Sequence, residues 1–194
     1  MVLIAGPSGA GKTTIVKYLE NTFPDSFKEA VSHTTRPIRP GEINGVHYHF
    51  VDKKEFERMI ENNELIEYMK IYDNYYGLSK KEIESILAEG KIPLIIVYPT
   101  ALPSYKEYCE EIGCLKLFFT APKDVLIERL KARGDSPEQL QKRLSKLDKE
   151  LEMEKELKDQ FDNVIVCVGS IEEVAGHVLD LIEQKKNQRF SIGR

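Results

Sequence analysis

The sequence predicts an α/β fold in which helices cover both faces of a central parallel sheet. The first observation is the alternation of short apolar runs with amphipathic segments along residues 93–184. The second is the run 93–98, which is almost wholly apolar, as in strands that are buried on both faces. The third is the apolar segment 2–5, which a glycine-rich turn and a helix follow at once. Together these patterns predict right-handed crossovers within one parallel sheet.

Composition limits the classes of protein to which the chain can belong. With 194 residues, 41% of them hydrophobic and 31% charged, it is long enough for one soluble domain with a large core. The net charge of −4 gives no basic field for nucleic acid, and no apolar stretch approaches the ~20 residues of a membrane span. The cysteines Cys109, Cys114 and Cys167 form no C-x-x-C pair, so we expect reduced, packed thiols in a cytoplasmic protein.

The strongest motif occupies residues 6–13, which have the spacing G-x-x-x-x-G-K-T of a phosphate-binding loop. Its glycines let main-chain N–H groups surround a phosphate, and the helix that starts at Lys12 favours an anion at its N-terminus. Lys12 supplies a cation for the β- and γ-phosphates, and the Thr13 hydroxyl can ligate Mg²⁺. The motif therefore predicts that the chain binds a nucleoside triphosphate through Gly6, Ser8, Gly9, Ala10, Gly11, Lys12, Thr13 and Thr14.

The first half of the chain continues with a helix over residues 12–22 and a short strand over 29–32. An irregular, proline-rich segment over 33–42 precedes an aromatic strand over 46–51 and a helix over 53–63 that Asp52 can cap. A strand over 65–72, a turn over 74–77 and a helix over 80–88 follow. Because these strands are short and of antiparallel type, we expect residues 33–89 to form an inserted subdomain.

The second half alternates more regularly. We expect strands over 93–98, 115–120 and 164–168, and helices over 104–112, 122–132, 137–159 and 171–184. In the charged run 142–158, both signs mix at i,i+4 spacing while Leu144, Leu147 and Leu151 point inward, as in a solvated helix face. Residues 185–194 are polar and are expected to be a frayed tail.

A second phosphate site is indicated within the insert. Arg36 and Arg39 are cations three residues apart, and guanidinium groups bind phosphate oxygens bidentately. Hydroxyl donors accompany them at Ser32, Tyr48 and Tyr76. From spacing alone, a solvated loop with ordinary core tyrosines explains the pattern equally well.

Several segments in order resemble guanylate kinase. They are the phosphate loop 6–13, the segment 32–42 (SHTTRPIRPGE), the segment 45–50 (GVHYHF) and the segment 74–77 (NYYG). The resemblance covers nearly the whole chain. It implies a core of residues 1–32, 90–122 and 151–187, a nucleoside-monophosphate-binding insert at 33–89, a mobile lid at 123–150 and a tail at 188–194.

The resemblance also implies roles for individual residues. Ser32, Arg36, Arg39, Tyr48, Tyr76 and Gly77 match positions around the acceptor phosphate. Glu67 matches the carboxylate that accepts hydrogen bonds from the guanine N1–H and 2-amino group, both of which are donors. Arg129, Arg133 and Arg143 match arginines that close over the phosphates and, with Lys12, Arg36 and Mg²⁺, stabilise charge on the transferred phosphoryl group.

Four departures from the family concern base recognition, the metal and the lid. Tyr98 stands where the family has a strand-end aspartate, and Leu78 stands where it has a second guanine-contacting hydroxyl, although Ser79 follows. The lid is about one residue shorter around residues 134–136, and residues 167–170 (CVGS) replace an Asn/Asp-rich adenine loop. The phosphate clamp is therefore complete while the base pockets differ.

The implied activity is transfer of the ATP γ-phosphoryl group to a nucleoside monophosphate, with GMP as the expected acceptor. One alternative is a kinase of the same fold that acts on another nucleotide or a sugar phosphate. The other is a non-catalytic guanylate-kinase-like binding module, although such modules typically lose the phosphate loop. We expect a monomer or homodimer without nucleic-acid or membrane partners. A zinc site at His47 and His49 lacks a third ligand at suitable spacing.

Overall fold

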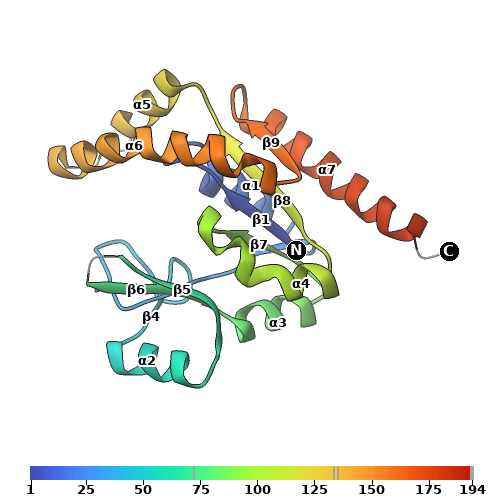
Figure 1. Ribbon diagram of the computed structural model, residues 1–194, viewed down its shortest axis with the longest axis horizontal. Helices are drawn as coiled ribbons and strands as arrows, with labels where there is room; N and C mark the ends of the chain where they lie inside the picture. Colours follow the sequence, from blue (N-terminus) through green and yellow to red (C-terminus); the bar gives the residue numbers. More distant parts are fainter. Residues whose placement is uncertain (72, 133, 135, 193–194) are drawn as a thin grey trace.

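In the computed structural model, described over residues 1–71, 73–132, 134 and 136–192, a five-stranded parallel sheet forms the centre of the molecule (Figure 1). Its strand order is β2-β7-β1-β8-β9, and every neighbouring pair is parallel. The strands are β1 (Val2–Ala5), β2 (Phe27–Glu29), β7 (Ile92–Ile96), β8 (Leu115–Thr120) and β9 (Asn163–Val166). The predicted α/β class with a parallel sheet is confirmed.

Helices bury both faces of this sheet. Successive side chains of a strand point to opposite faces, so Leu3 and Ile4 enter different core clusters and both are fully buried. Ile4 packs with the helices on one face, and Leu3 packs with Ile83 and Ile86 on the other. The helices of the described residues are α1 (Lys12–Thr22), α2 (Lys53–Glu61), α3 (Lys80–Ala88), the 3₁₀ helix η1 (Pro99–Tyr105), α4 (Lys106–Glu111), α5 (Lys123–Ala132), α6 (Pro137–Leu157), the 3₁₀ helix η2 (Lys158–Gln160) and α7 (Ile171–Ile192).

A second sheet lies beside the first, and all its strands fall within the predicted insert, residues 33–89 (Figure 1). Its order is β4-β3-β6-β5, with antiparallel pairing of β6 to both β3 and β5. The strands are β3 (His33–Thr34), β4 (His49–Phe50), β5 (Leu65–Ile71) and β6 (Asn74–Ser79). Helix α2 covers this sheet through Phe56 and Met59, and Asp52 caps it by accepting the N–H of Glu55 at 2.8 Å.

Several boundaries in the insert differ from the prediction. Residues 74–77 are not a turn but the first four residues of β6, because they pair with β5 and, at Tyr76 and Gly77, with β3. The predicted strand 46–51 shortens to His49–Phe50. The predicted strand 29–32 is wrong except at Glu29, the last residue of β2, because residues 30–32 form no strand and β3 begins at His33. In each case the pairing partner, which lies far away in the sequence, sets the ends of the strand.

The C-terminal third contains α5, α6 and α7. In the view of Figure 1, α5 and α6 extend to the left, as the second sheet does, and α7 extends to the right. The buried side chains of all three helices belong to the core cluster that contains Ile4. The predicted frayed tail is wrong as far as Ile192, because α7 continues to that residue. Leu147 of α6 is buried, and Leu144 and Leu151 pack beside it, as the helical pattern predicts. No helix in the described part of the chain is both long and apolar enough to cross a membrane.

The prediction of three reduced thiols is wrong for two of them. Cys109 in α4 and Cys114 just before β8 form a disulfide, with Cα atoms 4.7 Å apart. Gly113 has a φ of 78°, so the chain can turn back after α4 and bring the two cysteines together. Cys167 is a free thiol and is buried, as expected.

Candidate functional site

The loop between β1 and α1 has the backbone of a phosphate-binding turn. Gly6 has a φ of 144°, and a Cβ atom there would overlap the carbonyl oxygen of Phe119 on the neighbouring strand β8. Gly11, the N-cap of α1, has a φ of 90°. Only glycine adopts these conformations readily, so the loop can pass close to β8 and then turn into the helix. Ala10 is buried beneath the loop, where its N–H donates to the carbonyl of Pro7 at 3.2 Å.

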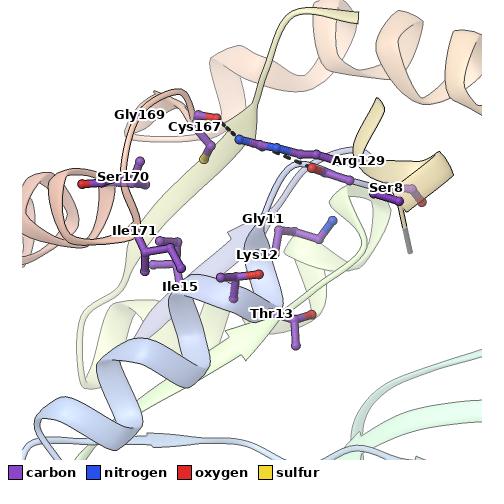
Figure 2. A pocket seen from close by; sticks show the side chains of 14 residues that line it. Ser8, Gly11, Lys12, Thr13, Ile15, Arg129, Cys167, Gly169, Ser170 and Ile171 are labelled. Carbon is purple, nitrogen blue, oxygen red and sulfur yellow. Dashed lines mark hydrogen bonds between the residues drawn. The ribbon is translucent and has the colours of Figure 1, made fainter. Parts of the chain in front are cut away.

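This loop forms one wall of a cavity of about 640 Å³, a volume in the range of nucleotide-sized sites (Figure 2). The opposite wall comes from α5 and from the start of α7. The loop residues that line the cavity are Ser8, Gly9, Gly11, Lys12, Thr13 and Thr14, and the other lining residues are Ile15, Arg129, Ala132, Cys167, Gly169, Ser170, Ile171 and Val174. A polar loop at one end and apolar side chains at the other suit a ligand with phosphates and a flat ring.

Two cations of the predicted set line this cavity. The Nζ of Lys12 donates to the carbonyl oxygens of Gly6 at 2.7 Å and of Pro7 at 2.9 Å, which holds the ammonium group against the loop. Arg129 of α5 donates through Nη2 to the carbonyl of Cys167 at 2.9 Å and through Nη1 to that of Gly9 at 3.4 Å. Figure 2 shows its side chain lying across the cavity between these two segments.

Arg143, the other predicted lid arginine that the structure describes, is placed differently: it is half-buried on α6 and does not line the cavity. Arg133 lies outside the described residues. Of the described lid arginines, Arg129 therefore reaches the phosphate loop.

The predicted acceptor residues gather in the insert around Arg36. Its guanidinium group lies 5.5 Å from the ring centroids of both Tyr48 and Phe50, and the rings of Tyr48 and Tyr76 are 5.9 Å apart. Glu42 accepts hydrogen bonds from Nη1 of Arg36 at 2.9 Å and from Nη2 at 2.7 Å. Because Arg36 binds this carboxyl group, the pKa of Glu42 is lowered to about 2, so Glu42 is ionised at neutral pH.

The remaining phosphate-clamp residues surround this cluster. Arg39 is exposed, and its backbone N–H donates to Glu42 at 2.8 Å. Ser32 immediately precedes β3, and its carbonyl accepts the N–H of His49 at 2.9 Å. Gly77 of β6 is buried, and a Cβ atom there would lie 2.7 Å from the carbonyl oxygen of Glu67. The loop and two strands of the insert thus bring Ser32, Arg36, Arg39, Tyr48, Tyr76 and Gly77 to one region.

Glu67, the predicted guanine ligand, lies on β5 at a bulge and pairs with Leu78 of β6. Desolvation raises the pKa of its carboxyl group to about 7. A carboxylate in such surroundings gains from a ligand that donates hydrogen bonds, since those bonds replace lost solvation. The position suits the donor edge of a purine such as guanine.

The two departures near the acceptor region have definite positions. Leu78 is buried in the core cluster that contains Leu3, and Ser79 caps α3 by accepting the N–H of Glu82 at 3.2 Å. Tyr98 follows β7, has 55% of its surface exposed, and is the N-cap of η1. Desolvation raises the pKa of Tyr98, and its electrostatic neighbours raise it further: they are Tyr48, Glu150, Tyr76 and Glu67. Tyr98 is therefore within electrostatic range both of Tyr48 and Tyr76 in the insert and of Glu150, which contacts the phosphate loop.

The histidines of the insert do not form a metal centre. Nδ1 of His47 accepts the N–H of Ile43 at 3.0 Å, and Nε2 of His49 lies 3.2 Å from a carboxylate oxygen of Glu82. The rings of His49 and His33 are 4.6 Å apart, and burial, followed by the nearby His49, lowers the pKa of His33 to about 4. Within the described part of the chain, no three His, Cys, Asp or Glu residues form a metal-binding group.

Two residues of the site were not predicted from the sequence. Glu42 ends the segment 32–42, six residues after Arg36. A carboxylate so close to an arginine on a proline-containing loop was the available signal for their ion pair. Glu150 of α6 accepts hydrogen bonds from Ser8 of the phosphate loop. Nothing in its charged helical surroundings distinguishes it from its neighbours in the sequence.

Comparison with known proteins agrees with this geometry. The family model described as guanylate kinase matches residues 1–185. A guanylate kinase from Neisseria gonorrhoeae is 39% identical over 190 residues, which cover 96% of this chain and 88% of that protein. One from Idiomarina loihiensis is 37% identical over 179 residues, 88% of this chain and 84% of that protein.

A solved structure gives the same result. The crystal structure of guanylate kinase from Anaplasma phagocytophilum is similar with a TM-score of 0.67 and 26% identity, over 95% of this chain and 84% of that one. The match of sequence family and fold covers both the phosphate loop and the insert. The chain therefore belongs to the guanylate kinase family.

Proposed function

We propose that the chain transfers the γ-phosphoryl group of ATP to GMP and releases GDP and ADP. The observation that carries the proposal is the family match over residues 1–185, in a chain that has both a complete phosphate loop and an arginine–tyrosine cluster on a separate sheet. The loop would hold the donor and the cluster the acceptor. A nucleotide kinase needs two such sites, because the two phosphorylated ligands must meet in line.

The donor site works through electrostatics. Main-chain N–H groups of the loop and the dipole of α1 favour the ATP phosphates. Lys12 and Arg129 already lie along the loop, so little rearrangement is needed for them to neutralise charge as the phosphoryl group moves. No side-chain base is required, since a phosphate monoester dianion is itself a nucleophile.

Magnesium fits the donor site. Thr13 is the second residue of α1, its side chain is exposed, and it lines the cavity beside Lys12, so its hydroxyl is a suitable oxygen ligand. When bound with ATP, Mg²⁺ would offset the negative charge of the β- and γ-phosphates. We assign Thr13 as the protein ligand of this ion.

The acceptor site divides into a phosphate end and a base end. Arg36 donates to Glu42 through Nη1 and Nη2 and to the carbonyl of Pro37 through Nη1, which fixes its orientation. Its remaining N–H groups would bind the acceptor phosphate. The phenols Tyr48 and Tyr76 add neutral donors beside it. At the base end, Glu67 would accept the N1–H and 2-amino group of guanine.

A different acceptor is the alternative that the structure motivates. Leu78 is buried and Ser79 caps α3, so recognition of guanine would rest mainly on Glu67. A site with fewer hydrogen-bonding groups rejects analogues less strongly. A substrate panel therefore forms part of the test.

The test is a coupled ADP-release assay with ATP, Mg²⁺ and a panel of nucleoside monophosphates and sugar phosphates. We expect GMP to outpace the other acceptors, Lys12→Ala to abolish turnover with all of them, and Glu67→Gln to weaken GMP selectively. Equal loss across the panel in Glu67→Gln would refute the role of Glu67, and a faster acceptor would replace GMP. Each variant is first compared with the unaltered chain by thermal unfolding.

The surroundings of the enzyme are part of the same proposal. We infer a cytoplasmic monomer or homodimer that acts on small nucleotides without a nucleic-acid or membrane partner. The net charge of −4 and the small size of both predicted ligands support this.

A further inference from the structure

A carboxylate of α6 binds the phosphate loop. Oε2 of Glu150 accepts the backbone N–H of Ser8 at 2.7 Å, and Oε1 accepts the Ser8 hydroxyl at 3.3 Å. The two residues are separated by 142 positions in the sequence, so only the fold brings them together. Ser8 is also one of the residues that line the cavity of about 640 Å³.

Packing directs this carboxylate toward the loop. Leu147 lies one turn before Glu150 on the same face of α6 and is buried with Leu126 and Leu130 of α5. Lys123 of α5 forms an ion pair with Asp148 of α6 at 2.5 Å. Helix α5 also contacts the loop through Arg129, which donates to the carbonyl of Gly9. The two helices of the predicted lid therefore touch adjacent residues of the phosphate loop.

The contact has the chemistry of phosphate binding. A negatively charged oxygen accepts a main-chain N–H and a hydroxyl of a glycine-rich loop, which are the donors that such loops offer to phosphate oxygens. A triphosphate in the loop and a carboxylate on Ser8 are both anions, and two anions at hydrogen-bonding distance from the same donors repel each other. Occupation of the loop by phosphate and the Ser8–Glu150 contact therefore exclude one another.

We propose that Glu150 is an internal competitor for the phosphate loop, which ties α6 to Ser8 until ATP displaces its carboxylate. The inference rests on the proposed donor site. It gives α6 a role that its charged sequence does not indicate, since displacement of Glu150 couples arrival of the donor to movement of the lid helix.

Competition lowers the apparent affinity for ATP. A ligand that binds only the open form has its affinity reduced by the fraction of molecules that are open. Charge-assisted hydrogen bonds are about twice as strong as neutral ones, so we expect removal of the Glu150 carboxylate to tighten ATP binding about fivefold or more. The affinity for GMP should not change, because the acceptor cluster lies on the insert.

The test is calorimetric titration of the unaltered chain, Glu150→Ala and Glu150→Gln with ATP and, separately, with GMP. Glu152→Gln is the matched control, because Glu152 is exposed on the same helix two residues away. We expect the ATP dissociation constant to fall in Glu150→Ala, to fall less in Glu150→Gln, which keeps one acceptor oxygen, and to stay unchanged in Glu152→Gln. Hydrogen exchange of residues 144–151 should rise when ATP binds to the unaltered chain, and should already be raised in Glu150→Ala.

The outcomes separate this inference from the proposed function. If the unaltered chain binds ATP and phosphorylates GMP, but Glu150→Ala folds and binds ATP equally well or more weakly, Glu150 is not a competitor. If the unaltered chain binds no ATP, the proposed donor site itself fails. Thermal unfolding of each variant shows whether a loss of affinity is only a loss of folded protein.

Discussion

Glu67 and Arg36 differ in how their surroundings affect their charged groups. Desolvation raises the pKa of Glu67 to about 7, so this carboxyl group favours a partner that donates hydrogen bonds. Arg36 is in the opposite situation, because Glu42 and two aromatic rings hold its charge in place. In the proposed function, Glu67 would gain hydrogen bonds from the acceptor base, and Arg36 would present a cation of fixed orientation to the acceptor phosphate.

The raised pKa of Glu67 predicts pH-dependent binding of GMP. The ionised form accepts both guanine donors, so the KM for GMP should rise as the pH falls below about 7 and should be flat well above it. The GMP phosphate itself titrates at about 6. Glu67→Gln is therefore the control: its residual pH dependence reports the phosphate alone, and a profile identical to that of the unaltered chain would contradict the assignment.

The same shift also affects stability. The native carboxyl group binds its proton more tightly than in the unfolded chain, whose ordinary pKa is 4.5. The unfolding free energy contributed by Glu67 therefore falls as the pH rises from 4.5 through about 7. In Glu67→Gln this decrease should be missing from the urea-unfolding midpoints measured across that range.

For single residues, the sequence predicts local motifs better than contacts between distant residues. The spacing of Gly6, Lys12 and Thr13 suffices to predict a phosphate loop, because the motif is local. The contact of Glu150 with Ser8 and the disulfide of Cys109 with Cys114 depend on how α4 and α6 are placed. Those placements come from long-range packing, which the local pattern does not contain.

Among the elements, β5 and β6 determine the geometry of the acceptor site. Glu67 lies on β5, Tyr76 and Gly77 lie on β6, and the two strands are paired antiparallel along most of their length. Gly77 allows close approach, because a Cβ atom there would lie 2.7 Å from the carbonyl of Glu67 and 2.9 Å from Cβ of Tyr68. The spacing of this hairpin thus sets the distance between the base end and the phosphate end.

Gly77→Ala should therefore disturb the acceptor site and leave the donor site intact. We expect a loss of about 1–3 kcal/mol in unfolding free energy, as for overpacked cores. The KM for GMP should rise while the ATP dissociation constant stays unchanged. Gly176→Ala in α7 is the control, since nothing lies within 4 Å of its added Cβ atom, and it should stabilise the chain by up to about 1 kcal/mol. Equal effects of the two substitutions on KM for GMP would show that the hairpin spacing is unimportant.

The helices were predicted more accurately than the strands of the insert. Helices α1 and α3 have the predicted ends, because caps and i,i+4 patterns are local signals. Residues 74–77 contain asparagine and glycine, which favour a turn, yet they form β6 because pairing on both edges outweighs that preference. Strand β4 is shorter than predicted because its pairing with β3 covers His49 and Phe50.

On the scale of the whole molecule, the parallel sheet, the insert and the α5–α6 pair carry different parts of the predicted site. The phosphate loop follows β1, the insert carries the predicted acceptor cluster, and both the insert and the α5–α6 pair extend to the left in the view of Figure 1. Tyr98 has electrostatic neighbours in both regions, since they include Glu150 beside the loop and Tyr48 in the insert. In the proposed function, a donor and an acceptor phosphate meet between these parts.

A bisubstrate ligand tests that claim most directly. The measurement is calorimetric titration with a dinucleoside polyphosphate in which adenosine and guanosine are joined end to end through their phosphates. We expect one molecule to bind per chain, more tightly than ATP or GMP alone, and both Lys12→Ala and Arg36→Ala to weaken this binding. Binding no tighter than that of ATP, with Arg36→Ala without effect, would contradict it.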